Sequence, residues 1–356
     1  MLRLKGAPQR LKDGLLSLKG GLLSLKGGLW ALALLIFALY PVVVTNPAYM
    51  TIAVYTLIYM SCATSWNMFS GYSGYVALGS AAFFGTGAYT MALLSIHLHM
   101  SGGEAMFWLV PLGGLAAMLA AVVVGAIALR VRRHTFVVIT IAIFFVFQLA
   151  AINMSYTGGS SGLSLPYVPW LISYFDVPFF YVALGILIVA TVLSALVRRS
   201  RFGLQLLAIR DDEDRALGLG VKVFPVKLTG FVLSSFAIGM AGALYAMFQG
   251  SIYPQFAFDP IFDISVALMA FFGGFGTLLG PLLGALILEY LQQYLTLTYS
   301  NGSLYLILEG SLLLFVILFM PQGIVVYVQQ WWTRRSLKKE TPTPVSGAAT
   351  TAGVVS

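Results

Sequence analysis

The stretch GGFGTLLGPLLG, residues 273–284, interrupts a long apolar run and decides how often this chain crosses a membrane. If one helix runs through the interruption, the tail ends on the opposite side from the leader; if the chain turns back, both end on the same side. Six glycine or proline residues crowd these positions. Helices are broken inside a membrane only where protein or a water-filled cavity covers the freed backbone groups. The stretch therefore predicts a turn in a central position, away from lipid.

The composition is that of a membrane protein. Hydrophobic residues make up 59% of the 356 residues and charged residues only 9%, whereas a soluble domain carries about 25% charged residues. Apolar runs recur that are long enough to cross a hydrocarbon core of about 30 Å. The sequence predicts an all-α polytopic membrane protein with about ten transmembrane helices, at roughly 29–45, 50–69, 75–96, 106–129, 135–153, 178–197, 228–249, 264–276, 278–295 and 304–320.

The basic residues orient these spans. All 20 Lys and Arg residues fall in the leader, at 130–133, between 198 and 227, or at 334–339. Positive charge marks the cytoplasmic side of a membrane. Ten spans place all four groups on that side, whereas nine spans would place the tail opposite the leader. The charges therefore favour the turn at 273–284 and predict cytoplasmic N- and C-termini.

Three parts are expected along the chain. Residues 1–28 form a basic cytoplasmic leader that contains LLSLKGG twice; it either rests on anionic lipid or is disordered. Residues 29–330 form the transmembrane domain, with a cytoplasmic loop at 198–227. Residues 331–356 form a disordered cytoplasmic tail.

Ten spans divide into two halves of five, and halves with an odd number of spans must be inverted, which is a recurring plan in transporters. We interpret the glycine-rich turns at 69–79 and 273–281 as matching positions in the two halves. Small residues there either let helices pack closely or act as hinges beside a translocation path. The hinge candidates are Gly71, Gly74, Gly79, Gly273, Gly274, Gly276, Gly280 and Pro281.

Ionisable groups inside a membrane are costly and indicate function by default. Glu309 lies deep in the last predicted span, where it either lines a pathway or subunit contact or packs as a protonated group. Glu289 lies near the outer end of its span, where its carboxylate would reach water. The sequence contains no G-x-x-x-x-G-K-[ST] nucleotide loop and no metal-site spacing. Cys62 is the only cysteine, so an internal disulfide is excluded and a packing role is expected.

The loop AIRDDEDRALGLGV, residues 208–221, gathers four of the 12 acidic residues of the chain, Asp211 to Asp214. Leucine and alanine residues on either side of the acids give a short amphipathic segment, and acids near the start of a helix favour its dipole. A short helix with an apolar patch at a cytoplasmic surface is typical of docking elements, although a charge run can also be a solvated surface. We predict that this loop binds a partner protein.

Five runs together carry a family resemblance: GYSGYVALGSAAFFGTGAYTMALL (71–94), TGGSSGLSLP (157–166), RFGLQ…LYA (201–246), GGFGTLLGPLLGA (273–285) and PQGI (321–324). The chain resembles the permease subunits of bacterial ABC importers for branched-chain amino acids, close to the M-type, with urea and short-chain amide permeases as near relatives. The resemblance implies a type II importer-like fold in the bacterial inner membrane. It also implies alternating access that is driven by separate ATPase subunits.

The resemblance also implies a docking site for those subunits. Importer permeases carry an E-A-A-x-x-x-G pattern there, and Asp214, Ala216 and Gly220 match its first, third and last places, whereas Arg215 departs from the second. The family commonly continues GYSG with S-L-G-H, where this chain ends in Ser80 instead of histidine. The implied docking residues are Asp211, Asp212, Glu213, Asp214, Arg215, Ala216 and Gly220.

The implied partners are a second homologous permease chain, two cytoplasmic ATP-binding subunits, and a periplasmic or lipid-anchored substrate-binding protein at the outer loops 154–177 and 250–263. This chain would bind membrane lipid, no nucleic acid and no cofactor, while ATP and Mg²⁺ would be bound by the partner subunits. Branched-chain or other hydrophobic amino acids are the expected cargo, and urea or short-chain amides are the alternative. An ion-coupled secondary transporter is the rival class, for which Glu309 and the break at 273–284 would be the best evidence.

Overall fold

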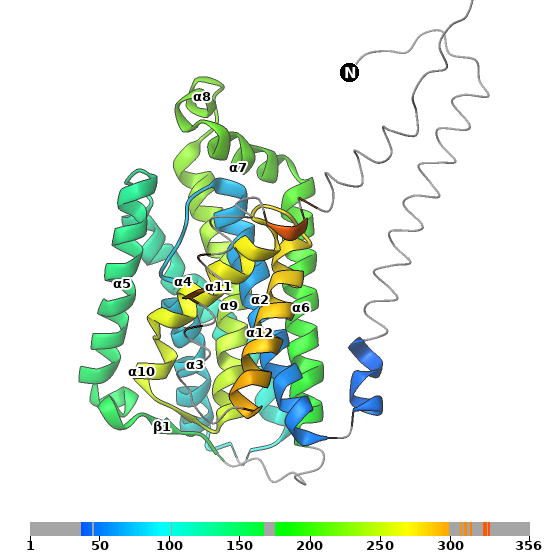
Figure 1. Ribbon diagram of the computed structural model, residues 1–356. Coiled ribbons are helices and arrows are strands. Elements are labelled where there is room, and N and C mark those ends of the chain that lie inside the picture. The colour runs from blue at the N-terminus through cyan, green and yellow to red at the C-terminus, as the bar shows by residue number, and fades with distance from the viewer. Residues whose placement is uncertain are drawn as a thin grey trace, which may run out of the picture.

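The computed structural model describes residues 37–44, 46–100, 102–166 and 175–298, together with a few positions between 307 and 327. The leader, the tail and Glu309 lie outside the described residues, so the expectations for them and the predicted domain boundaries stay predictions. Within the described ranges the chain is almost entirely helical, as the composition predicted (Figure 1).

The helices occur where the apolar runs predicted them. Residues 37–43 are helical, and the tenth predicted span falls largely outside the described residues. The elements that follow are α2 (Pro47–Ser73), α3 (Ser80–His97), η1 (Glu104–Leu109), α4 (Val110–Ala128), α5 (Arg133–Asn153), η2 (Ser155–Thr157), η3 (Gly159–Ser161), β1 (Leu163–Ser164), α6 (Asp176–Arg199), α7 (Arg201–Asp211), α8 (Glu213–Gly218), α9 (Val223–Gln249), β2 (Ser251–Ile252), α10 (Pro254–Ala257), α11 (Pro260–Gly274) and α12 (Gly280–Thr298).

Within the described part of the chain, five helical segments are both long and apolar enough to cross a membrane by themselves: Glu104–Ala128, Arg133–Asn153, Asp176–Arg199, Val223–Gln249 and Pro254–Gly274. The helix α2 is as long as α9, at 27 residues, but it carries more polar residues. It packs against α6, α9, α11 and α12, so its polar residues face protein and not lipid. Several of their hydroxyls donate within the helix; Ser61 and Thr64, for example, donate to Leu57 O and Met60 O at 2.8 and 2.7 Å.

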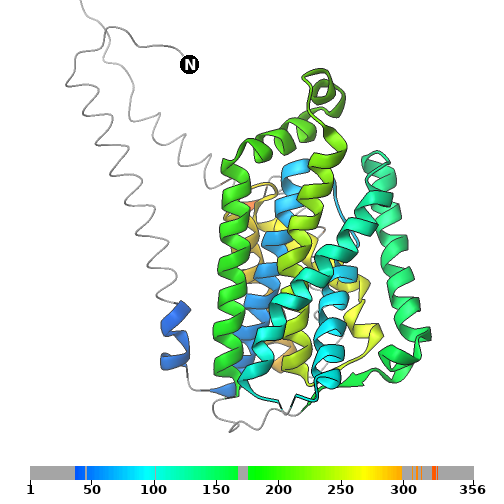
Figure 2. The same cartoon turned by 180° about the vertical axis from the view of Figure 1, so that it is seen from behind.

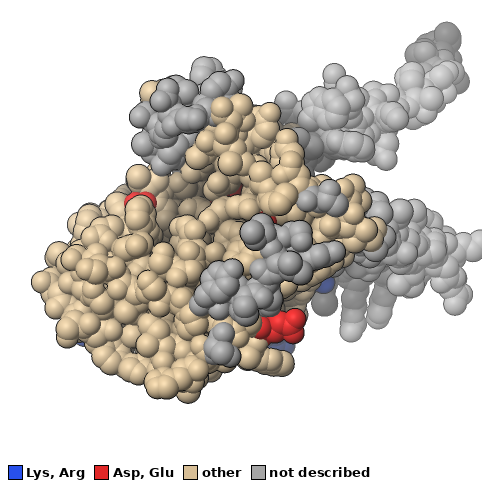
Figure 3. All heavy atoms as spheres, turned by 90° about the horizontal axis from the view of Figure 1, so that it is seen from below, with Lys and Arg blue, Asp and Glu red and all other residues tan. Residues whose placement is uncertain are grey.

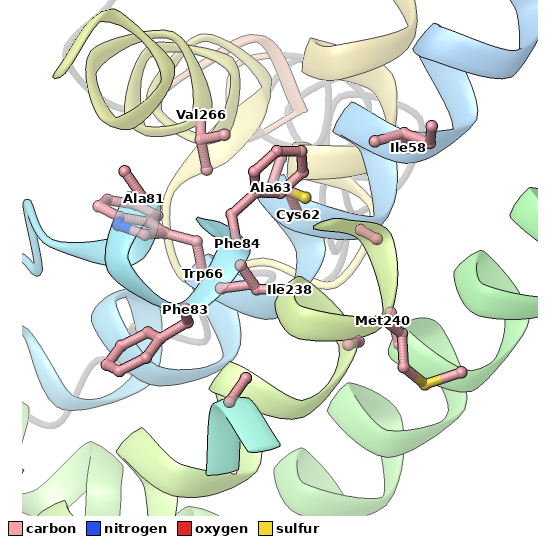
Figure 4. Close-up of a cluster of buried hydrophobic side chains, with 14 of the residues drawn as sticks. Ile58, Cys62, Ala63, Trp66, Ala81, Phe83, Phe84, Ile238, Met240 and Val266 are labelled. Atoms are coloured by element: carbon pink, nitrogen blue, oxygen red, sulfur yellow. The ribbon is translucent and has the colours of Figure 1, made fainter. Parts of the chain in front are cut away.

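The core lies where α2, α3, α9 and α11 meet (Figure 4). Trp66 of α2 is 1% exposed, and its Nε1–H donates to Ala77 O at 2.7 Å, which ties the turn after α2 back to that helix. Cys62 is fully buried beside it. The packing role that was expected for this cysteine is confirmed.

The turn at 273–284 is confirmed as a hairpin. The helix α11 ends at Gly274, the chain turns through two residues of positive φ, Gly274 and Gly276, and α12 begins at Gly280. The two helices pack against each other. A Cβ atom at Gly273 would lie only 1.7 Å from Gly280 O, so glycine at this position permits the tight crossing.

The two glycine-rich turns do not occupy matching positions of an inverted repeat. Both lie at the same end of the bundle, because Asn67 Nδ2 donates to Thr277 O and Gly276 N donates to Asn67 Oδ1. Equivalent turns of inverted halves must lie at opposite ends. The better match is α2 with α9: both have 27 residues, both end at a glycine of positive φ, Gly74 or Gly250, and Figure 1 shows them running in opposite directions.

The two ends of the bundle differ. One end carries α7 and α8, and α9 descends from it between α2, α3 and α4 (Figure 2). At the other end, β1 pairs with β2 in antiparallel register, Leu163 opposite Ile252. This pair joins the loops after α5 and α9, the two loops that were expected to receive a binding protein. Figure 3 views this end and shows a surface with very little Lys or Arg.

Candidate functional site

The acidic loop folds as the start of a short helix. Asp212 is the N-cap of α8, and its Oδ1 accepts hydrogen bonds from Asp214 N and Arg215 N, both at 3.0 Å. A side-chain oxygen at this position satisfies backbone donors that have no partner within the helix. The hydrogen bond from the Arg215 amide, with the charge of the Arg215 guanidinium, holds the pKa of Asp212 below its ordinary value. Asp212 thus turns the chain from α7 into α8.

Glu213 makes the strongest contacts of the four acids. Its Oε1 accepts from Lys227 Nζ at 2.9 Å, and its Oε2 accepts from the Tyr75 hydroxyl. Lys227 Nζ also donates to the Tyr75 hydroxyl at 3.1 Å, which closes a triangle. Tyr75 is fully buried and Lys227 is only 3% exposed. The triangle joins α8 to the start of α9 and to the turn between α2 and α3.

The charge states of this triangle follow from its contacts. Burial alone would raise the pKa of Glu213, but the hydrogen bonds from Tyr75 and Lys227 and the charge of Lys227 outweigh it, so the pKa lies below its ordinary value. Burial, and then the neighbouring Glu213, raise the pKa of Tyr75. Glu213 is therefore a carboxylate and Tyr75 a neutral donor at neutral pH, which is the pairing that the hydrogen bonds require.

A second set of contacts joins the α7–α8 turn to the start of α5. Arg133 Nη2 donates to Ile209 O and Arg210 O, both at 2.6 Å. Arg132 lies 3.5 Å from Asp214, although both side chains are largely exposed, so this ion pair contributes little. These basic and acidic residues line a polar hollow of about 290 Å³, together with Asp211 and His134.

Arg210 of α7 connects the two glycine-rich turns. Its Nη1 donates to Gly71 O at 2.8 Å, and its guanidinium lies 5.2 Å from the centre of the Phe275 ring. Gly74 and Gly276 lie directly against the same side chain, since a Cβ atom at either would lie 3.1 Å or less from it. The α7–α8 element, residues 200–220, is thereby held to the ends of α2, α5, α9 and α11.

The hinge candidates lie in three different places in the structure. Gly71, Gly74 and Gly276 meet at Arg210, as described. Gly79 lies apart, at the start of α3, where a Cβ atom would lie 2.7 Å from Thr140 O. The remaining candidates belong to the contact between α11 and α12, and they are Gly273, Gly274, Gly280 and Pro281. Their role as hinges stays a prediction.

The docking candidates divide into residues with partners in the chain and residues that project from it. Ala216 is buried, at 1% exposure, and Asp212, Glu213 and Asp214 are engaged as described. Leu217 and Leu219 are 53% and 83% exposed. Gly220 has a φ of +83° and open space around it. The exposed surface of α8 therefore combines an apolar tip, Leu217 and Leu219, with the exposed charged side chains of Asp214 and Arg215.

Sequence reasoning missed Lys227, Tyr75 and Arg210. Lys227 could have been found, because a cation five residues into an apolar helix requires a partner. The expectation that Glu289 would reach water is wrong: it is fully buried in α12, and Gln293 Nε2 donates to its Oε1 at 2.8 Å. Only one side of this segment of α12 is covered, since Ile287, Tyr290 and Leu291 are 46%, 40% and 44% exposed, and Glu289 lies on the covered side.

Comparison with known proteins gives a consistent result. Residues 48–317 match the family described as "Branched-chain amino acid transport system / permease component". The chain is similar to the high-affinity branched-chain amino acid transport system permease protein LivM of Salmonella typhimurium, at 27% identity over 83% of this chain and 74% of that protein. For LivM of Escherichia coli the identity is 27%, over 77% of this chain and 69% of that protein. No solved structure matches significantly.

A shorter match, at 27% identity over 38% of this chain and 44% of the relative, is with the ribose import permease protein RbsC of Bacillus subtilis. The range matched by the family spans α2 to α12, which includes the α7–α8 element and both glycine-rich turns. The resemblance that the motifs carried is confirmed, and the family is one of membrane transport components and not of catalysts. The chain therefore belongs to the family of permease components of branched-chain amino acid transport systems.

Proposed function

We propose that this chain is a permease subunit of an ATP-driven importer that moves branched-chain or other hydrophobic amino acids into the cytoplasm by alternating access. The observation that carries the proposal is the set of contacts from the α7–α8 element to the ends of α2, α5, α9 and α11. A displacement of α8 by a partner would reach four transmembrane helices at once. Such a partner needs only different affinities for the two states of the permease.

The partner at this end is an ATPase subunit. We place it on the cytoplasmic side, where the basic residues 130–133 and 198–227 lie. Two such subunits bind ATP and Mg²⁺ and dock on the two permease chains of the transporter. The exposed tip of α8, Leu217 and Leu219, supplies the apolar contact, and Glu213, which is bonded to the buried Lys227, transmits the force.

At the opposite end, a substrate-binding protein delivers the solute. The pairing of β1 with β2 gives these two loops a common platform, and the surface around it carries almost no positive charge (Figure 3). Both features support a docking role for the β1–β2 end, on the periplasmic side of a bacterial inner membrane.

The docking proposal predicts that Leu219→Asp abolishes ATPase binding without unfolding the permease. Leu219 is 83% exposed, so a charged side chain costs little in the free chain, where surface changes are usually within about 0.5 kcal/mol. At an interface the same charge is buried without a partner. The measurement is co-purification of the ATPase subunits with the solubilised permease.

Leu98→Asp is the matched control, because Leu98 is 59% exposed at the opposite end of the bundle. It should retain the ATPase subunits as wild type does. Equal recovery with Leu219→Asp and Leu98→Asp would contradict docking at α8. Replacing all four acids 211–214 is a poor test, since it would remove the N-cap of α8 and the partner of Lys227 together.

The cargo needs its own test, because relatives include the ribose permease as well as LivM. Vesicles with the assembled transporter should take up leucine when ATP and the binding protein are supplied. Uptake of urea or ribose in place of leucine would overturn the proposed cargo. Uptake without ATP, driven by an ion gradient, would overturn the proposed class.

A further inference from the structure

Two helices begin inside the bundle and meet near their N-termini. α3 starts at Ser80 after the extended segment 74–79, and α11 starts at Pro260 after the segment that follows β2. Asp263 in the first turn of α11 reaches α3: its Oδ1 accepts from Ser80 N at 2.7 Å and from Ala81 N at 3.1 Å. Helices that are broken in this way form substrate sites in other transporter folds.

The second carboxylate oxygen of Asp263 is unused. Asp263 is 2% exposed, and its Oδ2 has no hydrogen-bond partner among the described residues. The salt bridges in the described part of the chain all lie at the α7–α8 end, and none includes Asp263. A buried charge without a cation is strongly unfavourable. In a membrane protein such a group is the first candidate for binding a ligand.

The surroundings restrict the kind of ligand. No three His, Cys, Asp or Glu side chains of the described residues gather at a metal-sized site, so Asp263 is not part of a cluster of such metal ligands. The neighbouring Phe262 packs its ring 4.5 Å from that of Phe84 and 5.5 Å from that of Tyr59, centre to centre. The Ser80 hydroxyl lies beside the carboxyl group. A single anionic oxygen next to a hydroxyl and an aromatic wall suits an ammonium group attached to an aliphatic chain.

We propose that Asp263 Oδ2 binds the ammonium group of the transported amino acid at the junction of α3 and α11, with the aliphatic side chain against Phe84 and Phe262. This inference rests on the proposed function and names the residue that recognises its substrate. An ammonium group donates three hydrogen bonds and neutralises the carboxylate. A sugar hydroxyl or a urea amide would donate a hydrogen bond but bring no positive charge to pair with the carboxylate. Opening of the junction during alternating access admits the substrate.

Asp263→Asn is the decisive variant. Its amide oxygen can still accept from Ser80 N and Ala81 N, but its NH₂ group cannot bind an ammonium group. Asp259→Asn is the matched control: Asp259 is the N-cap of α11 and accepts from Ile261 N at 2.9 Å, a role that asparagine also performs. We expect leucine uptake by vesicles with the assembled transporter to fall about 10- to 100-fold in Asp263→Asn, as for a lost charged hydrogen bond. It should not fall in Asp259→Asn.

A second measurement separates recognition from a structural defect. The rise in melting temperature of the purified transporter is measured with leucine and with 4-methylpentanoate, which has the same side chain and carboxylate but no ammonium group. Wild type should be stabilised more by leucine, and Asp263→Asn should lose that difference. Equal stabilisation of wild type by both ligands, or by neither, would overturn the inference.

The two proposals fail in different ways. If wild type carries leucine and Asp263→Asn carries it equally well, the site is wrong and the importer stands. If wild type carries ribose or urea but not leucine, the proposed cargo is wrong, and the ammonium site is overturned with it.

Discussion

Replacing Gly87 with alanine is expected to destabilise the permease by about 3 kcal/mol, the upper range for overpacking a core. A Cβ atom at Gly87 of α3 would lie 2.0 Å from Gly239 O of α9. The contact is reciprocal, because a Cβ atom at Gly242 of α9 would lie 2.0 Å from Phe84 O. These are backbone atoms that no rotamer change can move, so the two helices would have to separate. Close packing of small residues is what holds helices together in lipid.

Gly185→Ala is the control for this prediction. Gly185 lies within α6, and nothing lies within 4 Å of the Cβ position there, so the added methyl group should be neutral or slightly stabilising. The measurement can use Cys62, the only cysteine, which is fully buried: a thiol-reactive fluorophore reports unfolding on heating. Gly87→Ala should react at a clearly lower temperature than Gly185→Ala. Equal melting curves would show that α3 and α9 are not in backbone contact.

The helices and the hairpin could be predicted from the sequence because lipid imposes them. Backbone groups in a membrane must be satisfied within a helix, so apolar length and the position of Lys and Arg determine the spans and their orientation. The partners of each helix could not be predicted in this way. Glycines such as Gly87 and Gly239 indicate that another helix approaches the backbone closely, but the sequence does not identify that helix. The wrong match of the two glycine-rich turns has another cause: ten spans that begin in the cytoplasm already place the turns after spans two and eight on the same side.

The sequence predicted where the docking site lies but not the contacts that build it. The acids 211–214 were singled out for docking, yet their contacts depend on residues far along the chain, such as Tyr75 and Lys227. Asp263 was missed because the predicted span began one residue after it, which left the acid in a loop. The structure places it in the first turn of a buried helix. Tertiary pairing of this kind leaves no local signal in a single sequence.

Glu213→Ala should cost about 3 kcal/mol of stability, because removing one partner of a buried ion pair leaves the other charge uncompensated. The ammonium group of Lys227 would remain at 3% exposure with only the Tyr75 hydroxyl as an acceptor. Asp211→Ala is the control, since Asp211 is an exposed acid two positions earlier and its loss should change stability by less than about 0.5 kcal/mol.

The pH dependence of the stability should reveal the ion pair between Glu213 and Lys227. Because the folded pKa of Glu213 lies below its ordinary value of 4.5, its stabilisation is complete above that pH and is lost as the pH falls through the lower folded value. Melting temperatures measured between neutral and acid pH should therefore converge for wild type and Glu213→Gln at the acid end. Curves that stay parallel would indicate that Glu213 is not paired in the folded protein.

The same residue tests whether the triangle transmits force or only stabilises α8. Replacing both partners of a buried ion pair with apolar residues of similar size is often neutral or stabilising, so Glu213→Leu with Lys227→Met should recover most of the stability that Glu213→Ala loses. If the link from α8 to α9 needs the charges, the double variant should still bind the ATPase subunits and hydrolyse ATP while leucine uptake stays low. Recovery of uptake together with stability would show that any firm contact between α8 and α9 suffices. In that case coupling would depend on the backbone contacts of Arg133 and Arg210.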